Sequence, residues 1–150
     1  MSFEPGVLDA NILVCAVEAG APQHAISRAL IEAARDPATV LYLTSQVLCE
    51  FYSVVTNPRR VALPRSPAEA ISAISVLLAL PGIRVLSTPP RAVAGLVGLL
   101  QRHPVTGADV FDLQLVATMQ AHNIRRIYTF NTRDFEVFPE LTVIAPREAA

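Results

Sequence analysis

The stretch Gly6–Leu13, GVLDANIL, sets the expected fold. Its apolar residues before Asp9 are typical of a short buried β-strand, and the apolar residues 10–17 predict a helix directly afterwards. Asp9 therefore falls at the carboxyl end of a strand, followed two residues later by Asn11. Because ligands of open α/β sheets bind at this edge, we expect a functional site around Asp9.

Strand-like and helical segments alternate along the rest of the chain. Short apolar runs predict further strands at 40–43, 83–86, 126–130 and 141–144. Helical patterns cover 24–35, 45–57, 67–80, 91–103 and 109–122, and 131–135 is a loop or a helical turn. This order predicts an α/β fold, with a central parallel sheet flanked by helices in a single domain of residues 1–150.

Composition narrows the functional classes. A net charge of −1 does not indicate a nucleic-acid binder by itself. All 12 basic residues are arginine, which excludes mechanisms that need an amine, such as Schiff bases or P-loop lysines. No apolar run reaches membrane-spanning length and no secretory signal is visible, so we expect a cytoplasmic protein without a membrane partner.

Cysteines and histidines give little sign of a site. Cys15 and Cys49 lie in apolar helical stretches, where a free thiol usually behaves as a small buried hydrophobe. A disulfide between them is the alternative, disfavoured in a reducing compartment. His24, His103 and His122 have no metal-ligand spacing, and we interpret them as surface or helix-end residues.

Glu50 lies at the edge of an apolar helix face. At 100° per residue it falls about 40° from Val54, beside the arc that includes Val47 and Phe51. A Glu whose only role is to face solvent would be expected on the helix face opposite the apolar arc. The alternative is a border residue with its carboxylate in water.

Asp112 lies on a helix face that must point into the core. Leu115, Val116 and Met119 follow it at spacings of three, four and seven. The alternative is that Asp109 caps this helix and Asp112 supports its dipole from the third position, which is compatible with a site at the rim of the core. We assign Asp109 mainly to capping.

A fourth acid follows the predicted strand 126–130. Thr129, Asn131 and Asp134 lie at or just beyond its carboxyl end, the edge to which Asp9 is also assigned. Alternatively, Asn131 caps a turn whose third position is Asp134.

The cost of bringing these acids together indicates a cation. Two ionised carboxylates 4 Å apart repel by about 4 kcal/mol at an effective dielectric near 20, and several such pairs rival a domain's stability of roughly 5–15 kcal/mol. Such a cluster needs shifted protonation or a bound cation. Oxygen donors favour Mg²⁺ or Mn²⁺ over zinc, and these ions commonly act in phosphoryl chemistry.

Taken in order, these motifs resemble the PIN-domain family and, within it, the VapC-type ribonuclease toxins of bacterial toxin–antitoxin pairs. LDANIL, the helical Glu of QVLCEFYSVVTNPRR, VFDLQLVATM, and TFNTRDF followed by LTVIAP span nearly the whole chain. The third motif departs from the commoner form, which has alanines at Leu113 and Val116, and this should alter packing rather than chemistry.

The resemblance implies a PIN-like three-layer α/β/α fold and an acidic metal site formed by Asp9, Glu50 and Asp112. Asp134 is implied as the fourth acid, and Asn11, Thr129 and Asn131 as polar supports. It also implies Mg²⁺, a homodimer, and a small VapB-like antitoxin whose tail occupies the active-site groove.

We therefore expect metal-dependent hydrolysis of RNA phosphodiesters, with arginines attracting a backbone that the acids repel. Arg59, Arg60 and Arg133 are the candidates for phosphate contacts, although each could equally be a solvated surface residue.

Three other functions compete with this one. A phosphotransferase using Asp9 as a nucleophile would need the lysine that the chain lacks. A PIN-fold nuclease in RNA processing, outside a toxin pair, would have the same acids. A non-catalytic module that binds RNA or protein would be favoured by loss of a central acid, and all four are present.

Overall fold

A computed structural model of the chain describes residues 2–148. Within them, parallel strands form one sheet in the order β3-β2-β1-β4-β5. Val7 at the centre is aligned with Tyr42 on one side and Ile127 on the other. The strands are β1 (Gly6–Leu8), β2 (Leu41–Thr44), β3 (Ile83–Leu86), β4 (Arg126–Tyr128) and β5 (Thr142–Ile144).

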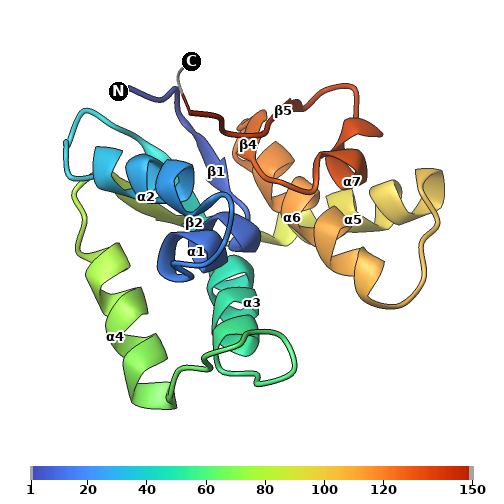
Figure 1. The fold of residues 1–150 in the computed structure, drawn as a ribbon. Helices are drawn as coiled ribbons and strands as arrows, with labels where there is room; N and C mark the ends of the chain where they lie inside the picture. The colour runs from blue at the N-terminus through green and yellow to red at the C-terminus, as the bar shows by residue number, and fades with distance from the viewer. Residues whose placement is uncertain (1, 149–150) are drawn as a thin grey trace.

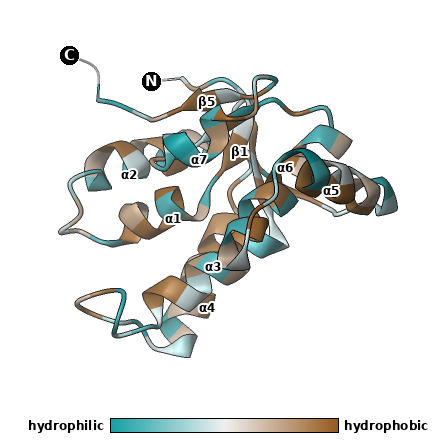
Figure 2. Ribbon diagram, turned by 90° about the vertical axis from the view of Figure 1, so that its right-hand side faces the viewer, coloured by the Kyte–Doolittle hydropathy of each residue, from teal (hydrophilic) through white to brown (hydrophobic). Residues whose placement is uncertain are grey.

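Helices cover both faces of this sheet, and the predicted α/β fold is confirmed. Figure 2 shows α1 and α2 on one side of β1, with α5 and α6 on the other. The two termini lie together at one end, while α3 and α4 extend from the other (Figure 1). The helices are α1 (Ala10–Val17), α2 (His24–Ala33), α3 (Ser45–Val55), α4 (Pro67–Leu78), α5 (Pro90–Arg102), α6 (Val110–Ala121) and α7 (Thr132–Glu136), with a 3-10 turn, η1 (Gly107–Asp109), before α6.

Local chemistry sets where these helices begin. The Thr44 hydroxyl accepts the Val47 N–H at the start of α3. Ser66 and Glu69 form a reciprocal capping box at α4, with Pro67 in the first helical position. The predicted ends of most helices and strands lie within two residues of the observed ends. Differences of this size are expected because the ends of helices and strands fray.

The core lies at the centre of the sheet. The side chains of Leu8, Leu41, Leu43 and Ile127 are fully buried there. Gly82, just before β3, approaches the α2 end closely, since a Cβ at this position would lie 2.8 Å from the carbonyl oxygens of Ala34 and Thr39. This contact leaves room only for glycine.

Helix α4 is only partly covered. Ala70 and Leu77 are buried against the core, whereas Ile71 and Val76 are exposed. Core packing therefore accounts for one face of this helix and leaves the other open. None of the helices in residues 2–148 is long and apolar enough to cross a membrane.

Both cysteines are free thiols, and they differ in burial. Cys15 is half-buried, but Cys49 is exposed, so the prediction of a buried thiol there is wrong. Cys49 lies on the side of α3 that turns away from the core. The histidines lie at helix ends as predicted: His24 begins α2, and His103 and His122 follow α5 and α6.

Candidate active site

The site lies where the strand order reverses. The chain builds outward from β1 through β2 to β3, then returns to place β4 on the other side of β1. Crevices at such switch points, outside the carboxyl ends of the strands, are where α/β sheets bind ligands. Asp9 follows β1 and Thr129 follows β4, so both lie at this point.

Asp9 is fixed by hydrogen bonds from both neighbouring segments. The Ala10 N–H donates to Asp9 Oδ1 at 2.8 Å and begins α1, while the Thr129 hydroxyl donates to Oδ2 at 2.7 Å. The Asp9 side chain is buried, with the residue 6% exposed. Burial raises the pKa of Asp9, the two hydrogen bonds oppose this, and the charge of Asp134 adds to it.

Asn11 extends this network between β1 and β4. Its amide nitrogen donates to Asp9 Oδ2 at 3.3 Å and to Thr129 Oγ1 at 3.2 Å, and its carbonyl oxygen accepts the Phe130 N–H. The Asn131 N–H donates to Thr129 Oγ1. Asn11 and Thr129 therefore hold Asp9 in one orientation.

Glu50 projects from α3 as a half-buried side chain. Burial raises the pKa of Glu50, a hydrogen bond from Gln46 opposes this, and the charge of Asp9 raises it further. Gln46 Nε2 donates to Glu50 Oε1 at 3.0 Å and to the Phe111 carbonyl oxygen at 2.7 Å. Gln46 thus links the Glu50 helix to the start of the Asp112 helix.

Asp112 responds most strongly to the assembled acids. Burial raises its pKa, and the charges of Asp134, Asp9, Glu50 and Asp109 raise it further, to about 7. Leu115, Val116 and Met119 are buried, so the prediction that this helix face points into the core is confirmed.

The prediction that Asp109 caps α6 is wrong. Its side chain makes no capping hydrogen bond, because Asp109 is already in the helical conformation at the end of η1. Asn131 likewise makes no side-chain cap at α7.

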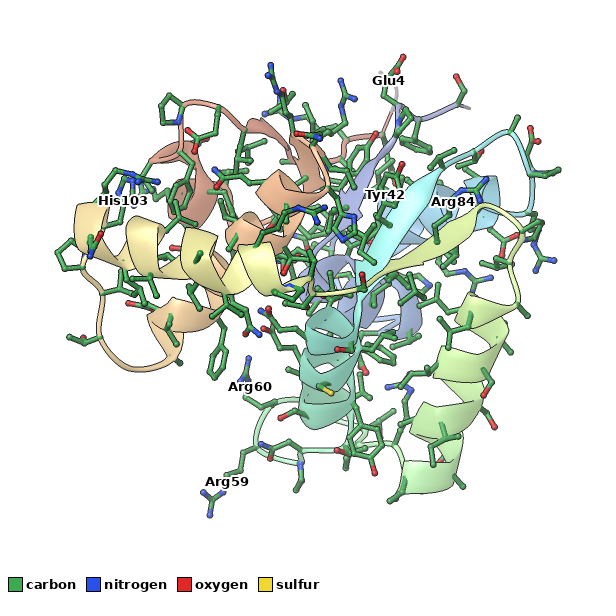
Figure 3. All side chains as sticks on the ribbon, turned by 180° about the vertical axis from the view of Figure 1, so that it is seen from behind. Glu4, Tyr42, Arg59, Arg60, Arg84 and His103 are labelled. Atoms are coloured by element: carbon green, nitrogen blue, oxygen red, sulfur yellow. The ribbon has the colours of Figure 1, made fainter. Side chains whose placement is uncertain are left out.

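The remaining candidates are distributed unevenly. Asp134 is exposed and does not line the groove, although its charge acts on both Asp9 and Asp112. Among the arginines, Arg60 lines the groove, whereas Arg59 and Arg133 do not. Figure 3 shows Arg60 beside the base of α3, with Arg59 directed away from the fold.

Asp9, Glu50 and Asp112 open into one groove of about 810 Å³. Asn11, Asn131, Arg60 and Asp109 also line it. Three more residues of α3 line the groove and were not predicted: Gln46, Cys49 and Ser53. Their successive spacing of three and four residues places them on one helix face with Glu50, and this spacing is visible in the sequence.

The sequence model of the PIN domain matches residues 6–141. The chain belongs to the PIN domain family. VapC ribonuclease Mb2897 of Mycobacterium bovis is 34% identical to this PIN domain over 116 residues, 77% of this chain and 79% of the relative. Ribonuclease VapC33 of Mycobacterium tuberculosis is 31% identical over 109 residues, 73% and 76% of the two chains.

Solved structures share the fold of this PIN domain. Mycobacterium tuberculosis VapC20, a sarcin-ricin loop cleaving toxin, matches with a TM-score of 0.67 and 19% identity, covering 90% of this chain and 95% of its own. VapBC2 from Rickettsia felis, bound to a DNA fragment from its promoter, matches with a TM-score of 0.64 and 18% identity, covering 94% of this chain and 98% of its own. At these identities the likeness establishes the fold.

The donors of this PIN domain suit a hydrated divalent cation. PIN-domain nucleases generally use such metals. Within residues 2–148, no three acidic, histidine or cysteine side chains are close enough together to hold an ion directly. Mg²⁺ commonly keeps several waters and binds only one or two carboxylates, so the acids at this groove fit in type and charge. Burial first, and then the charges of the neighbouring acids, raise the pKa of Asp112, and a bound cation would offset the repulsion among those charges.

Proposed function

We propose that this chain is a Mg²⁺-dependent endoribonuclease of the VapC type that hydrolyses RNA phosphodiesters in the groove beside Asp9. The observation that carries the proposal is that Asp9, Glu50 and Asp112, from three separate elements, line one groove in a chain 34% identical to a VapC ribonuclease. Mn²⁺ has the same ligand preferences and is the alternative ion.

Each residue has a proposed part in this reaction. Asp9, Glu50 and Asp112 would together hold the hydrated ion, one or two of them as direct ligands and the others through its bound waters, and Asp134 would add negative charge from the rim. A bound divalent cation supplies charge neutralisation at the scissile phosphate and a lowered pKa for water. Because ligation needs an ionised carboxylate, Asp112 would release its proton as the ion binds.

Polar and basic residues complete the proposed site. Thr129 and Asn11 keep Asp9 oriented through the hydrogen bonds described above. Asn131, which lines the groove, would support the attacking water. Arg60 would contact a phosphate, whereas Arg59 and Arg133 would contribute only at longer range.

We also propose a VapB-like antitoxin as a partner and a homodimer as the assembly. Support for the antitoxin comes from structures that share the fold, which include VapBC2 of Rickettsia felis and a toxin–antitoxin complex from Klebsiella pneumoniae. The homodimer rests on the resemblance to VapC-type toxins alone. We propose the cytoplasm as the location, since the proposed substrate is RNA.

The test is to express the protein and its Asp9→Asn variant in bacteria and to map new RNA 5′ ends by sequencing. Asn keeps the side-chain shape and removes one metal-binding charge. We expect discrete new ends and growth arrest with the unaltered protein only. Glu4→Gln, which removes an exposed acid far from Arg60 in Figure 3, is the matched control and should behave like the unaltered protein.

New ends from Asp9→Asn at the unaltered rate would contradict the proposed site. Absence of new ends with every folded variant, in the source organism as well, would favour a non-catalytic binding module. Circular dichroism of each purified variant shows whether it is folded.

A further inference from the structure

Phe111 is an exposed aromatic residue at the rim of the groove. It lies next to Asp112, lines the groove and is 48% exposed. Every other Phe and Tyr among residues 2–148 is buried or half-buried. An open phenyl ring beside the acids differs from the aliphatic residues exposed elsewhere, and it suits a ligand with a flat apolar face.

The backbone at Phe111 is held in place. Its carbonyl oxygen accepts the hydrogen bond from Gln46 Nε2, which also donates to Glu50. The backbone that carries the ring is therefore tied to the Glu50 helix, although the two residues are far apart in sequence. An aromatic side chain has only two rotatable bonds, so on a held backbone it loses little conformational freedom when a ligand stacks on it.

Charge alone gives this groove little attraction for RNA. Arg60 is its one basic lining residue, and it forms no ion pair with any acid of the described chain. Asp9, Glu50 and Asp112 repel phosphates until a cation is bound. Stacking on an aromatic ring needs no charge and is available for every base, because each has a π-face.

We propose that Phe111 stacks on an unpaired base of the substrate, next to the phosphate that is cleaved, while Arg60 contacts the backbone. This inference rests on the proposed ribonuclease function and deepens it. A base inside a duplex is already stacked on its neighbours, so the groove accepts RNA that is single-stranded at the cleaved position.

The binding test uses the absence of tryptophan from the chain. Phe111→Trp, combined with Asp9→Asn to prevent cleavage, carries a single tryptophan at the rim. Val93→Trp in the same background places it on the exposed face of α5, outside the groove. The probe is a 12-nucleotide RNA of mixed sequence, given single-stranded or annealed to its complement.

We expect the single strand to quench the tryptophan fluorescence of the Phe111→Trp protein saturably. The duplex should quench it much less, and neither RNA should quench the Val93→Trp protein. Equal quenching of both proteins, equal quenching by both forms of RNA, or no quenching would each overturn the proposal. This readout does not depend on cleavage.

The kinetic test uses the otherwise unaltered protein and an RNA found by 5′-end mapping. Phe111→Ala should raise KM by about tenfold with little change in kcat, as loss of one stacked base predicts, and Phe111→Tyr should restore it. An unchanged KM with active enzyme would overturn stacking and leave the ribonuclease function standing.

The two proposals fail separately. Unchanged cleavage by Asp9→Asn would refute the proposed active site, while quenching would still decide the role of Phe111. If Phe111→Ala changed the oligomeric state in size-exclusion chromatography without changing KM, the ring would be a protein contact and stacking would be refuted.

Discussion

Replacing Asp112 with Asn should stabilise the ion-free protein, and only above acidic pH. Its pKa rises from 3.8 to about 7 on folding, so the folded state holds a proton that the unfolded state has lost. The stability linked to this group is present below about pH 4 and is lost as the pH rises towards 7. Asn carries no charge and avoids that loss.

The size of the effect follows from the shift. One pKa unit corresponds to about 1.4 kcal/mol, which gives roughly 4 kcal/mol for the whole shift at full strength. Asp112 is only half-buried, and solvent screens its interactions with the other acids. We therefore expect Asp112→Asn to gain about 2 kcal/mol of unfolding free energy at pH 8 and much less at pH 4.5.

The assay is urea unfolding followed by circular dichroism, with EDTA present, at both pH values. Glu4→Gln removes an exposed acid away from the groove and should change the free energy of unfolding little at either pH. If Asp112→Asn stabilised the protein equally at pH 4.5 and pH 8, or not at all, the electrostatic reasoning would be refuted.

Three further predictions concern the ion, the packing at Gly82 and the loop between α3 and α4. At pH 8, millimolar Mg²⁺ should raise the Tm of the unaltered protein and raise that of Asp9→Asn less, as differential scanning fluorimetry would show; equal shifts would contradict an ion at this acid. Gly82→Ala should cost about 1–3 kcal/mol in urea unfolding because two carbonyl oxygens occupy the Cβ position, whereas Gly20→Ala, with nothing within 4 Å, should cost little. Arg65→Ala should speed proteolysis between α3 and α4, since Arg65 bonds the Glu18 carboxylate and the Val17 carbonyl oxygen; an unchanged rate in a timed trypsin digest would show that the loop is held otherwise.

Most elements and the faces of the key helices could be predicted from the sequence. Periodicity is local, so it places Asp112 on the face of Leu115 and sets Glu50 beside an apolar arc without knowledge of the rest of the chain. The carboxyl-edge rule for parallel sheets likewise placed Asp9 and Thr129 together, because both follow strands of one sheet.

The paths of loops, and contacts between residues far apart in the sequence, could not be predicted from local patterns. Arg59 and Arg60 are adjacent, yet only Arg60 reaches the groove, because the path of the segment after α3 depends on tertiary contacts. Asp109 is not a cap because η1 already continues the helix backward, which residue type alone does not reveal. The role of Gln46 depends on a hydrogen bond to a carbonyl oxygen 65 residues away in the sequence, which local periodicity does not predict.

The hydrogen bonds divide the groove into a fixed wall and an adjustable one. The Asp9 side chain accepts hydrogen bonds from the start of α1 and from Thr129, the residue after β4, so moving it would break contacts with both segments together. The helices that carry Glu50 and Asp112 are instead linked through one side-chain amide, that of Gln46, which donates to Glu50 and to the Phe111 carbonyl oxygen. If a bound ion draws the acids closer together, α3 and α6 would move while Asp9 stays in place. The positions of these two helices relative to Asp9 would then set the width of the groove.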